Sequence, residues 1–405
     1  MNIVTPTEPL AFPPPVQEMT RSQPAGEASA VSAISIPDRL PSLDGWRALS
    51  ILLVLGAHTV LASGFPQQHA SLVNKISDGH LGVRFFFVIS GFLITWLMLS
   101  EERKTSRVKL GKFYARRALR ILPVYMAFLL VAGVLQYYTV CDHDLTTWIA
   151  NLTFTRDFFP GGNKVSNHFW SLAVEEQFYL IWPFVFAAMA PASRAKIMPL
   201  LVAGTIVVAV ICRVFWSHPL SSSPVWHSVF QEWSFLNNAD SLAIGCMAAI
   251  WLAADTYGLR AWLTTRRLLV FSTGFFMLLE PQLVYWLADH PGLPSALRRA
   301  GWASSFCLGR TVQSAGFAIL ALQSILLPAW GLYRCLNWRP VAALGVLSYS
   351  IYIWQNLFCA KPSTYGLTDP WWMSFQFWLI PAFTTALISY HFLEKPFFNL
   401  RHRFR

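Results

Sequence analysis

Ten long apolar segments dominate this chain and decide what it can fold into. Each is about as long as a helix needs to cross the hydrocarbon core of a bilayer, roughly 20 residues. Only 13% of the 405 residues are charged and 55% are hydrophobic, whereas about a quarter of the residues in soluble domains are charged. We therefore predict an all-α, polytopic membrane protein with about ten transmembrane helices. The segments cover about 45–64, 80–99, 120–140, 168–190, 198–216, 236–254, 268–287, 302–329, 341–360 and 372–393.

The positions of the lysines and arginines predict the orientation of these helices. With the N-terminus inside, alternating loops place 21 basic residues inside and 6 outside. This excess follows the positive-inside rule and puts both termini in the cytoplasm, as expected for a multi-pass protein of the cell inner membrane. The net charge of +11 is then mostly a consequence of topology, and no nucleic-acid partner is expected.

Polar tails flank the apolar domain. Residues 1–40 contain three consecutive prolines and no basic start that leads into an apolar core. We expect a disordered cytoplasmic tail there, without a cleaved signal peptide. The transmembrane domain then covers 41–398, and 399–405 form a basic cytoplasmic tail. The six cysteines are scattered without metal-ligand spacing, so neither a disulfide framework nor a metal site is expected.

Arg47 and His58 are the clearly polar, titratable side chains inside the first apolar segment. Ionisable residues are costly in a membrane helix and mark candidate functional sites. Eleven residues make three helical turns plus about 20°, so both side chains project from one face, about 16 Å apart along the axis. The pair could hold the two ends of a long anionic ligand.

The first inner loop carries a dense cluster of basic residues before the third segment. Attraction to anionic lipid headgroups explains much of this charge. Arg117 and Arg120 are three residues apart and share a helix face, with Arg116 adjacent. Because guanidinium groups bind phosphate oxygens well, we predict a phosphate-binding role for these three residues.

Two adjacent carboxylates, Glu175 and Glu176, lie a short way into the fourth segment. Packing does not explain such a pair in a membrane helix. Counted from the outer ends of their segments, the glutamates and His58 share a similar depth. A carboxylate beside an imidazole fixes its tautomer and raises its basicity, as general-base catalysis needs.

Three further polar residues are candidates for substrate or oxyanion binding. Ser90 precedes Gly91, a pair that is either a small-residue packing notch or a place where a ligand approaches the backbone. Asp240 in the sixth segment either bonds a neighbouring helix or contacts substrate. Tyr349 belongs to a polar stripe in the ninth segment that is too dense for an interfacial aromatic belt alone. Seven other histidines lie in or near outer loops and are more typical of ordinary loop residues: His69, His80, His143, His168, His218, His227 and His290.

Six motifs, in order, resemble the integral-membrane acyltransferase 3 family, whose members O-acylate surface glycans and some antibiotics. LDGWRALSILLVLGAH is similar to the opening motif of the family, FFVISGFL to the second, and FYARRALRILPVY to the basic third. WSLAVEEQFYLIWP is similar to the fourth, and LGVLSYSIYIWQ and YHFLEKPFF match the closing segments. Together they extend over nearly all of residues 43–398.

The resemblance implies ten core helices, a cytosolic acyl-CoA donor and no bound cofactor. It also implies that His58 is catalytic, that Arg47 supports it, and that Arg117 and Arg120 lie near the CoA. Many members carry His at the position of Gln355 and a basic residue at that of Asn238, so no base role is assigned to Gln355 and Asp240 is a weaker site. Some members add a soluble esterase-like domain after the last span, which we do not expect in a chain of this length.

The predicted reaction moves a short acyl group, most often acetyl, from the CoA thioester to a hydroxyl. The favoured acceptor is a lipid-linked or exopolysaccharide sugar. Arg47, Arg117 and Arg120 bind the CoA phosphates, and the thioester reaches His58. Either His58 deprotonates the acceptor directly, or an acyl group first rests on a protein side chain. Glu175 or Glu176 orients His58, and Ser90 or Tyr349 binds the developing oxyanion.

Two other classes of function are alternatives. In a transporter or flippase, the intramembrane charges line a substrate path, which accounts for Arg47, Glu175 and Asp240 but not for the basic loop. A receptor or scaffold predicts that the intramembrane polar residues can be exchanged together for apolar ones without loss of function.

Overall fold

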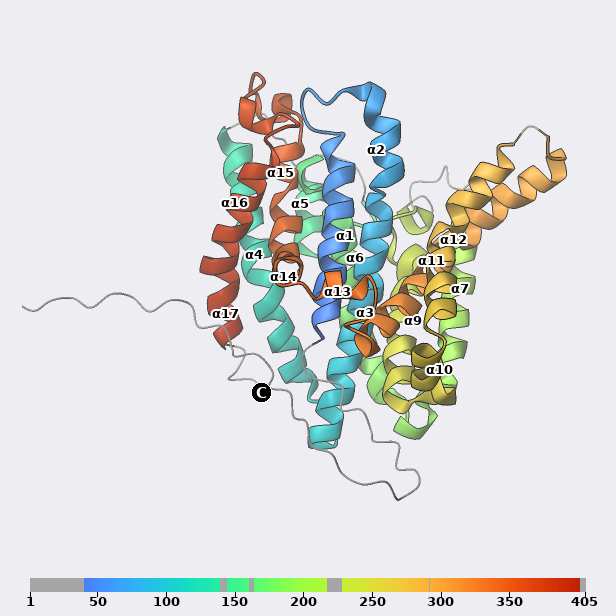
Figure 1. The fold of residues 1–405 in the computed structure, drawn as a ribbon. Coiled ribbons are helices and arrows are strands. Elements are labelled where there is room, and N and C mark those ends of the chain that lie inside the picture. The colour runs from blue at the N-terminus through green and yellow to red at the C-terminus, as the bar shows by residue number, and fades with distance from the viewer. Residues whose placement is uncertain (1–39, 139–143, 160–163, 217–227, 291, 401–405) are drawn as a thin grey trace, which may run out of the picture. The chain divides into compact units, whose positions relative to one another are not determined.

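In the computed structural model, residues 40–138, 144–159, 164–216, 228–290 and 292–400 are described. These residues form helices, and no β-strand occurs among them (Figure 1). The long helices are α1 (Pro41–Thr59), α3 (Gly79–Thr105), α4 (Leu110–Tyr138), α6 (Phe169–Ala188), α7 (Arg194–Trp216), α9 (Phe235–Ala254), α11 (Arg267–Ala288), α12 (Ser295–Leu326), α14 (Arg339–Trp354) and α16 (Leu379–Ser389). Nearly all of the two predicted tails, 1–40 and 399–405, lies outside the described residues.

Short helices connect the long ones. They are α2 (Ala70–Ile76), α5 (Leu145–Leu152), α10 (Leu259–Thr265), α13 (Tyr333–Leu336), α15 (Asn356–Cys359) and α17 (Lys395–Leu400). Six 3₁₀ turns add Gln67–His69, Lys164–Ser166, Pro191–Ser193, Thr256–Gly258, Pro362–Tyr365 and Trp371–Met373, and a π-helix, η8 (Tyr390–Glu394), joins α16 to α17.

Each of the ten predicted apolar segments holds a helix, so the all-α prediction is confirmed. Six stretches are long and apolar enough to cross a membrane, and they contain α3, α4, α7, α9, α11 and α12. The helices α1 and α6 carry several polar residues, and α14 and α16 are only 16 and 11 residues long before the helix changes. Ten crossings and the cytoplasmic termini therefore remain predictions.

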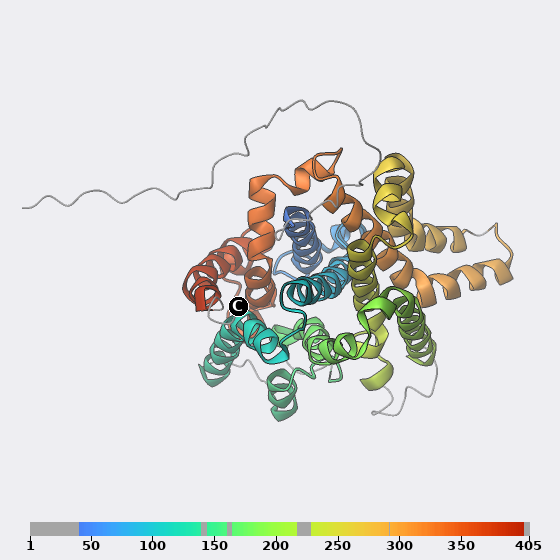
Figure 2. The ribbon, with the colours of Figure 1, turned by 90° about the horizontal axis from the view of Figure 1, so that it is seen from below.

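The helices α1 and α3 pack together, and the later helices are arranged around them (Figure 2). In addition to α3, α1 packs against α12, α13 and α14, while α9 packs against α3, α6, α7 and α12. In Figure 1, α1 begins at the lower end of this bundle and ends at the upper end. We use "lower end" and "upper end" for these two sides, so α3 begins at the upper end and α4 at the lower end.

The contact between α3 and α9 leaves no room for a side chain on either helix at its closest point. A Cβ atom at Gly91 would lie 2.1 Å from the carbonyl oxygen of Leu242, and one at Gly245 would lie 2.1 Å from the carbonyl oxygen of Val88. The space beside Gly91 is therefore filled by the backbone of α9. Of the two interpretations of the Ser90–Gly91 pair, the packing notch is the one that the structure supports for Gly91.

A buried carboxyl group holds the loop before α6 to the start of α9 at the upper end. Asp157 accepts hydrogen bonds from Gln177 Nε2 (2.7 Å) and from the backbone N–H of Phe235 (3.1 Å). Its carbonyl oxygen accepts another from the side chain of Gln231. Because the carboxyl is shielded from water, burial raises the pKa of Asp157 to about 7, from about 3.9 in an unfolded chain.

Replacing Gly91 by Ala should destabilise the protein. The added methyl group forces α3 away from α9, and overpacking of this kind costs about 1–3 kcal/mol. We expect a lower unfolding temperature in detergent, measured by the fluorescence of the 18 tryptophans. Gly204→Ala in α7 is the matched control, because no heavy atom lies within 4 Å of a Cβ at that position. Equal unfolding temperatures for Gly91→Ala and the wild type would contradict this packing.

The Asp157 carboxyl should make stability depend on pH. Its pKa is higher in the folded than in the unfolded state, so the folded state holds the proton more tightly. Its contribution is full below about pH 4 and is lost as the pH rises through about 7. We expect the unfolding temperature to fall between pH 5 and pH 8, and to fall less in Asp157→Asn. The same slope in both proteins would show that Asp157 does not titrate in this range.

Candidate functional site

His58 lies in the last turn of α1 and has a buried amide as its partner. Its Nδ1 atom is 3.2 Å from Oε1 of Gln355, which is fully buried where α14 meets α15. An amide oxygen can only accept a hydrogen bond, so this contact favours the tautomer with the proton on Nδ1. The lone pair on Nε2 is then available to accept a proton from a ligand.

Among the described residues, the hydrogen bond of His58 Nδ1 goes to Gln355 and not to a glutamate. We expected Glu175 or Glu176 to share the depth of His58, counting the first segment to residue 64. In fact α1 ends at Thr59, so His58 is at the upper end of the helix. Glu175 is seven residues into α6, which puts it about 10 Å below the start of that helix.

A second group of polar residues surrounds Glu175 below the level of His58. The hydroxyl of Tyr179 donates to Glu175 Oε2 at 2.9 Å, and the hydroxyl of Ser90 bonds the same carboxylate. The guanidinium carbon of Arg117 lies 4.1 Å from the centre of the Tyr179 ring, a cation–π contact. Arg47 and Arg117 both interact with the charge of Glu175. The structure thus brings together predicted residues from α1, α3, α4 and α6.

Several buried polar atoms in these two groups have no hydrogen-bond partner among the described residues. They are Arg117 Nε, Glu176 Oε1, Ser348 Oγ and Gln355 Nε2. More than nine in ten buried polar groups in folded proteins are paired. Other unpaired buried atoms occur elsewhere among the described residues, but these four belong to polar residues of the matched motifs and can bond a polar ligand.

The three arginines of the basic motif point to different partners. Arg116 pairs with Glu101 of α3 at 2.6 Å, Arg117 packs on Tyr179 of α6, and Arg120 interacts with the charge of Glu394 in η8. Glu394 is 2% exposed and accepts a hydrogen bond from Ser350. It also interacts with Arg47, so Arg47 interacts with the charges of both Glu175 and Glu394.

The two predicted oxyanion donors already have partners. Tyr349 donates its hydroxyl proton to the carbonyl oxygen of Ile121 at 2.8 Å. Ser90 bonds Glu175, as described above. Ser348, next to Tyr349, is buried, and its hydroxyl is unpaired among the described residues. Ser348 therefore has a free O–H donor, which we expected at Tyr349 from the sequence.

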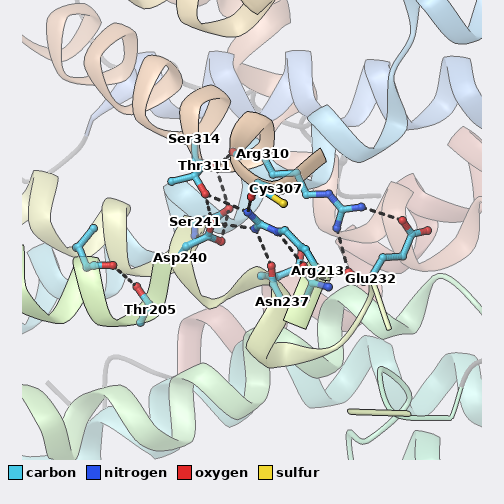
Figure 3. A network of polar contacts seen from close by, with 12 residues as sticks. Thr205, Arg213, Glu232, Asn237, Asp240, Ser241, Cys307, Arg310, Thr311 and Ser314 are labelled. Atoms are coloured by element: carbon cyan, nitrogen blue, oxygen red, sulfur yellow. Dashed lines mark hydrogen bonds and ion pairs between the residues drawn. The ribbon is translucent and has the colours of Figure 1, made fainter. Parts of the chain in front are cut away.

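Asp240 lies in a separate polar network that joins α7, α9 and α12 (Figure 3). Its Oδ2 atom is 2.9 Å from Arg213 Nη2 and 2.5 Å from the Thr311 hydroxyl, and its Oδ1 atom accepts from the Ser241 N–H. Arg213 also bonds Asn237 and the carbonyl oxygen of Cys307. Both side chains of the ion pair are almost inaccessible, at 2% and 0%. Among the described residues, the hydrogen bonds of Asp240 thus go to helix partners and not to the other predicted site residues.

Sequence reasoning overlooked four polar residues that the structure places around the predicted ones. His80 and His168, expected to be loop residues, both interact electrostatically with His58, and His168 is 5% exposed. Gln355 and Glu394 lie inside the matched motifs but were given no role. Glu394 could have been identified from the sequence only as a single carboxylate that follows the last apolar segment, in HFLEKP.

No group of three or more His, Cys, Asp or Glu side chains among the described residues could hold a metal ion. The polar groups described above are dominated by arginine, amide and hydroxyl groups, which bind anions and neutral polar ligands better than divalent cations.

Comparisons with known proteins agree with the motifs. A family whose profile is described as an acyltransferase domain matches residues 40–394. A putative peptidoglycan O-acetyltransferase of Bacillus subtilis, YrhL, is 26% identical over 377 residues, which is 88% of this chain and 54% of that protein. The O-acetyltransferase OatA of Staphylococcus aureus is 24% identical over 391 residues, 89% of this chain and 57% of that protein.

The chain therefore spans little more than half the length of these relatives. No solved structure matches it significantly.

Removing one partner of the Arg213–Asp240 pair should destabilise the protein. Asp240→Ala leaves a buried, uncompensated guanidinium group, which costs about 3–5 kcal/mol. We expect a marked fall in unfolding temperature, and recovery in the paired variant Arg213→Met with Asp240→Leu, which removes both charges. If the paired variant is as stable as the wild type but has lost all activity, Asp240 acts in the chemistry and not only in holding helices together.

Proposed function

This chain belongs to the integral-membrane acyltransferase 3 family, and from that premise we propose that it is a membrane O-acyltransferase. It takes an acyl group, most simply acetyl, from cytosolic acyl-CoA and transfers it to a sugar hydroxyl of a glycan. The observation that carries the proposal is the hydrogen bond between His58 and Gln355. It leaves Nε2 of His58 free to act as a base, on the same helix as Arg47.

We propose His58 as the general base. With its proton held on Nδ1 by Gln355, Nε2 accepts the proton of the acceptor hydroxyl as that oxygen attacks the thioester carbonyl. The C–S bond then breaks, and the CoA thiolate leaves and recovers the proton from Nε2. This direct route needs no acylated side chain, and the hydroxyl of Ser90 bonds Glu175.

The arginines near the lower end are the proposed CoA site. Arg47, Arg117 and Arg120 come from α1 and α4, with Arg116 held at their edge by Glu101. Guanidinium groups are suited to the CoA phosphates. The pantetheine arm then extends about 16 Å along α1 to reach His58. In this proposal the lower end is the cytoplasmic side, in accordance with the distribution of basic residues.

Glu175 and Glu176 position the donor arginines in this proposal, and they do not orient His58. Glu175 fixes Tyr179 by a hydrogen bond of 2.9 Å, and Tyr179 supports Arg117. The unpaired Oε1 of Glu176 and the unpaired hydroxyl of Ser348 are available to the ligand. We assign the developing oxyanion to Ser348, because its neighbour Tyr349 donates to a backbone carbonyl.

The acceptor we propose is a glycan of the cell envelope. The relatives are named for O-acetyl transfer, and one of them for peptidoglycan. A peptidoglycan sugar therefore takes precedence over the lipid-linked and exopolysaccharide sugars that the sequence favoured. In each of these acceptors the reacting group is a secondary or primary hydroxyl, which a neutral imidazole can deprotonate in the transition state.

Substitutions of His58 and Gln355 test the mechanism. His58→Ala should lower kcat for acetyl transfer by about 10²–10⁴-fold, the usual contribution of a general base. Gln355→Leu should lower kcat by at least about tenfold without a change in KM for acetyl-CoA, because it frees the imidazole to rotate or to change tautomer. Gln355→His, which keeps a hydrogen-bonding ring at this position, should retain more activity than Gln355→Leu. The assay is release of CoA by the purified protein with a glycan acceptor.

Gln136→Leu in α4 is the matched control for loss of a glutamine, since Gln136 accepts a hydrogen bond from the indole N–H of Trp148 near the end of α4. If His58→Ala transfers acetyl groups at the wild-type rate, the proposed mechanism is wrong. A transporter or flippase, the alternative drawn from the sequence, would release no CoA in the wild-type assay.

A further inference from the structure

Two stacked indole rings lie at the upper end, close to the end of α1. Trp170, in the first turn of α6, and Trp233, just before α9, have ring centres 5.9 Å apart and planes 15° apart. The His80 ring lies 6.4 Å from Trp170. Trp170 is 9% exposed, Trp233 is half-buried and His80 is exposed. The stack is thus buried at one edge and open at the other.

An ion pair lies beside this stack and remains accessible. Arg310 Nη2 is 2.8 Å from Glu232 Oε2, and the two side chains are 24% and 40% exposed. Glu232 is the residue before Trp233, and Arg310 also donates to its carbonyl oxygen. A carboxylate and a guanidinium group held together offer acceptors and donors side by side. This arrangement suits the adjacent hydroxyl groups of a sugar ring, because each hydroxyl is both a donor and an acceptor.

Two buried donors in the same region have no hydrogen-bond partner among the described residues. They are the indole N–H of Trp233 and the Nε–H of Arg84. The other end of the Arg84 guanidinium bonds Asp78 at 3.2 Å. Because an indole N–H and a guanidinium N–H can only donate, a ligand that satisfies them must supply oxygen acceptors.

Electrostatic contacts connect this region to the proposed base. The His80 ring interacts electrostatically with Glu232, Arg310 and Arg84, and His58 interacts with His80. Trp170 is in the first turn of α6 and Trp233 precedes α9, so a ligand on the stacked rings lies at the same end of the bundle as His58. The proposed donor reaches His58 from the opposite side, along α1.

We propose that Trp170, Trp233, His80, Glu232 and Arg310 form a binding site for a sugar ring of the acceptor glycan, which we term the acceptor platform. The inference rests on the proposed function, and it gives a binding site for the acceptor, the second substrate of the reaction. The face of the Trp233 ring that Trp170 does not cover packs against the C–H face of the sugar, because the π-face of an aromatic ring is negative. The Glu232–Arg310 pair bonds neighbouring hydroxyls, and the unpaired N–H groups bond ring or acetamido oxygens.

Binding and turnover can be measured separately in the purified full chain. The probe is the β-1,4-linked tetramer of N-acetylglucosamine, with acetyl-CoA as donor. We expect Trp233→Ala to raise KM for the tetramer at least about tenfold and to leave KM for acetyl-CoA unchanged. Trp233→Phe, which keeps a flat ring, should stay within about threefold of the wild type. Trp371→Ala is the matched control, because this exposed tryptophan packs on Phe377 and lies outside the platform.

A measurement without turnover separates this inference from the proposed function. The tetramer should raise the unfolding temperature of the wild type and of His58→Ala, but not that of Trp233→Ala. Glu232→Gln is the second platform variant if Trp233→Ala does not fold, and it should weaken the same shift. An equal shift or an equal acceptor KM in the platform variants and in Trp371→Ala overturns the platform. A wild-type protein that binds the tetramer but releases no CoA supports the platform and overturns the acyl transfer.

Discussion

The cost of leaving a polar group unpaired in a bilayer controls the placement of the functional side chains in this protein. Hydrocarbon supplies no hydrogen bonds, so each intramembrane charge must find its partner inside the protein. In the Arg213–Asp240 pair both side chains are almost inaccessible to solvent, and each makes several hydrogen bonds within the protein. Glu175 is satisfied by Tyr179 and Ser90, and His58 by Gln355. Against this background the buried atoms that have no partner among the described residues, such as Glu176 Oε1 and Ser348 Oγ, become informative.

Close helix packing makes these pairings possible. Because Gly91 and Gly245 carry no side chain, the backbones of α3 and α9 come into direct contact, and α3 also packs along α1. Ser90, one residue from this contact, is thereby held beside Glu175 on α6. Gly91, at which the sequence left open an approach of a ligand to the backbone, thus serves to bring two helices together.

The two polar groups along α1 suggest how a two-substrate reaction can be separated in space. Arginines and buried carboxylates gather toward the lower end, where the proposed acyl-CoA donor binds. Histidines and stacked tryptophans gather at the upper end, where the acceptor platform is proposed. His58 belongs to the upper group but shares one helix with Arg47, so a single rigid element sets the distance between donor phosphates and base.

The sequence alone determined the all-α class, the family and the candidate residues, because hydropathy, motif order and the cost of intramembrane charge are local properties. It could not determine which residues touch. The depth of His58 was misjudged because the apolar run continues to residue 64 whereas α1 ends at Thr59, and helix ends depend on tertiary contacts. The hydrogen-bond partner of His58 could not be predicted because Gln355 is 297 residues away in the sequence. Asp240 and Glu175 carry the same signal, a carboxylate in an apolar helix. Only the packing of α7 and α12 around Asp240, and of α1, α3 and α4 around Glu175, decided which one joins helices and which one belongs to the candidate site.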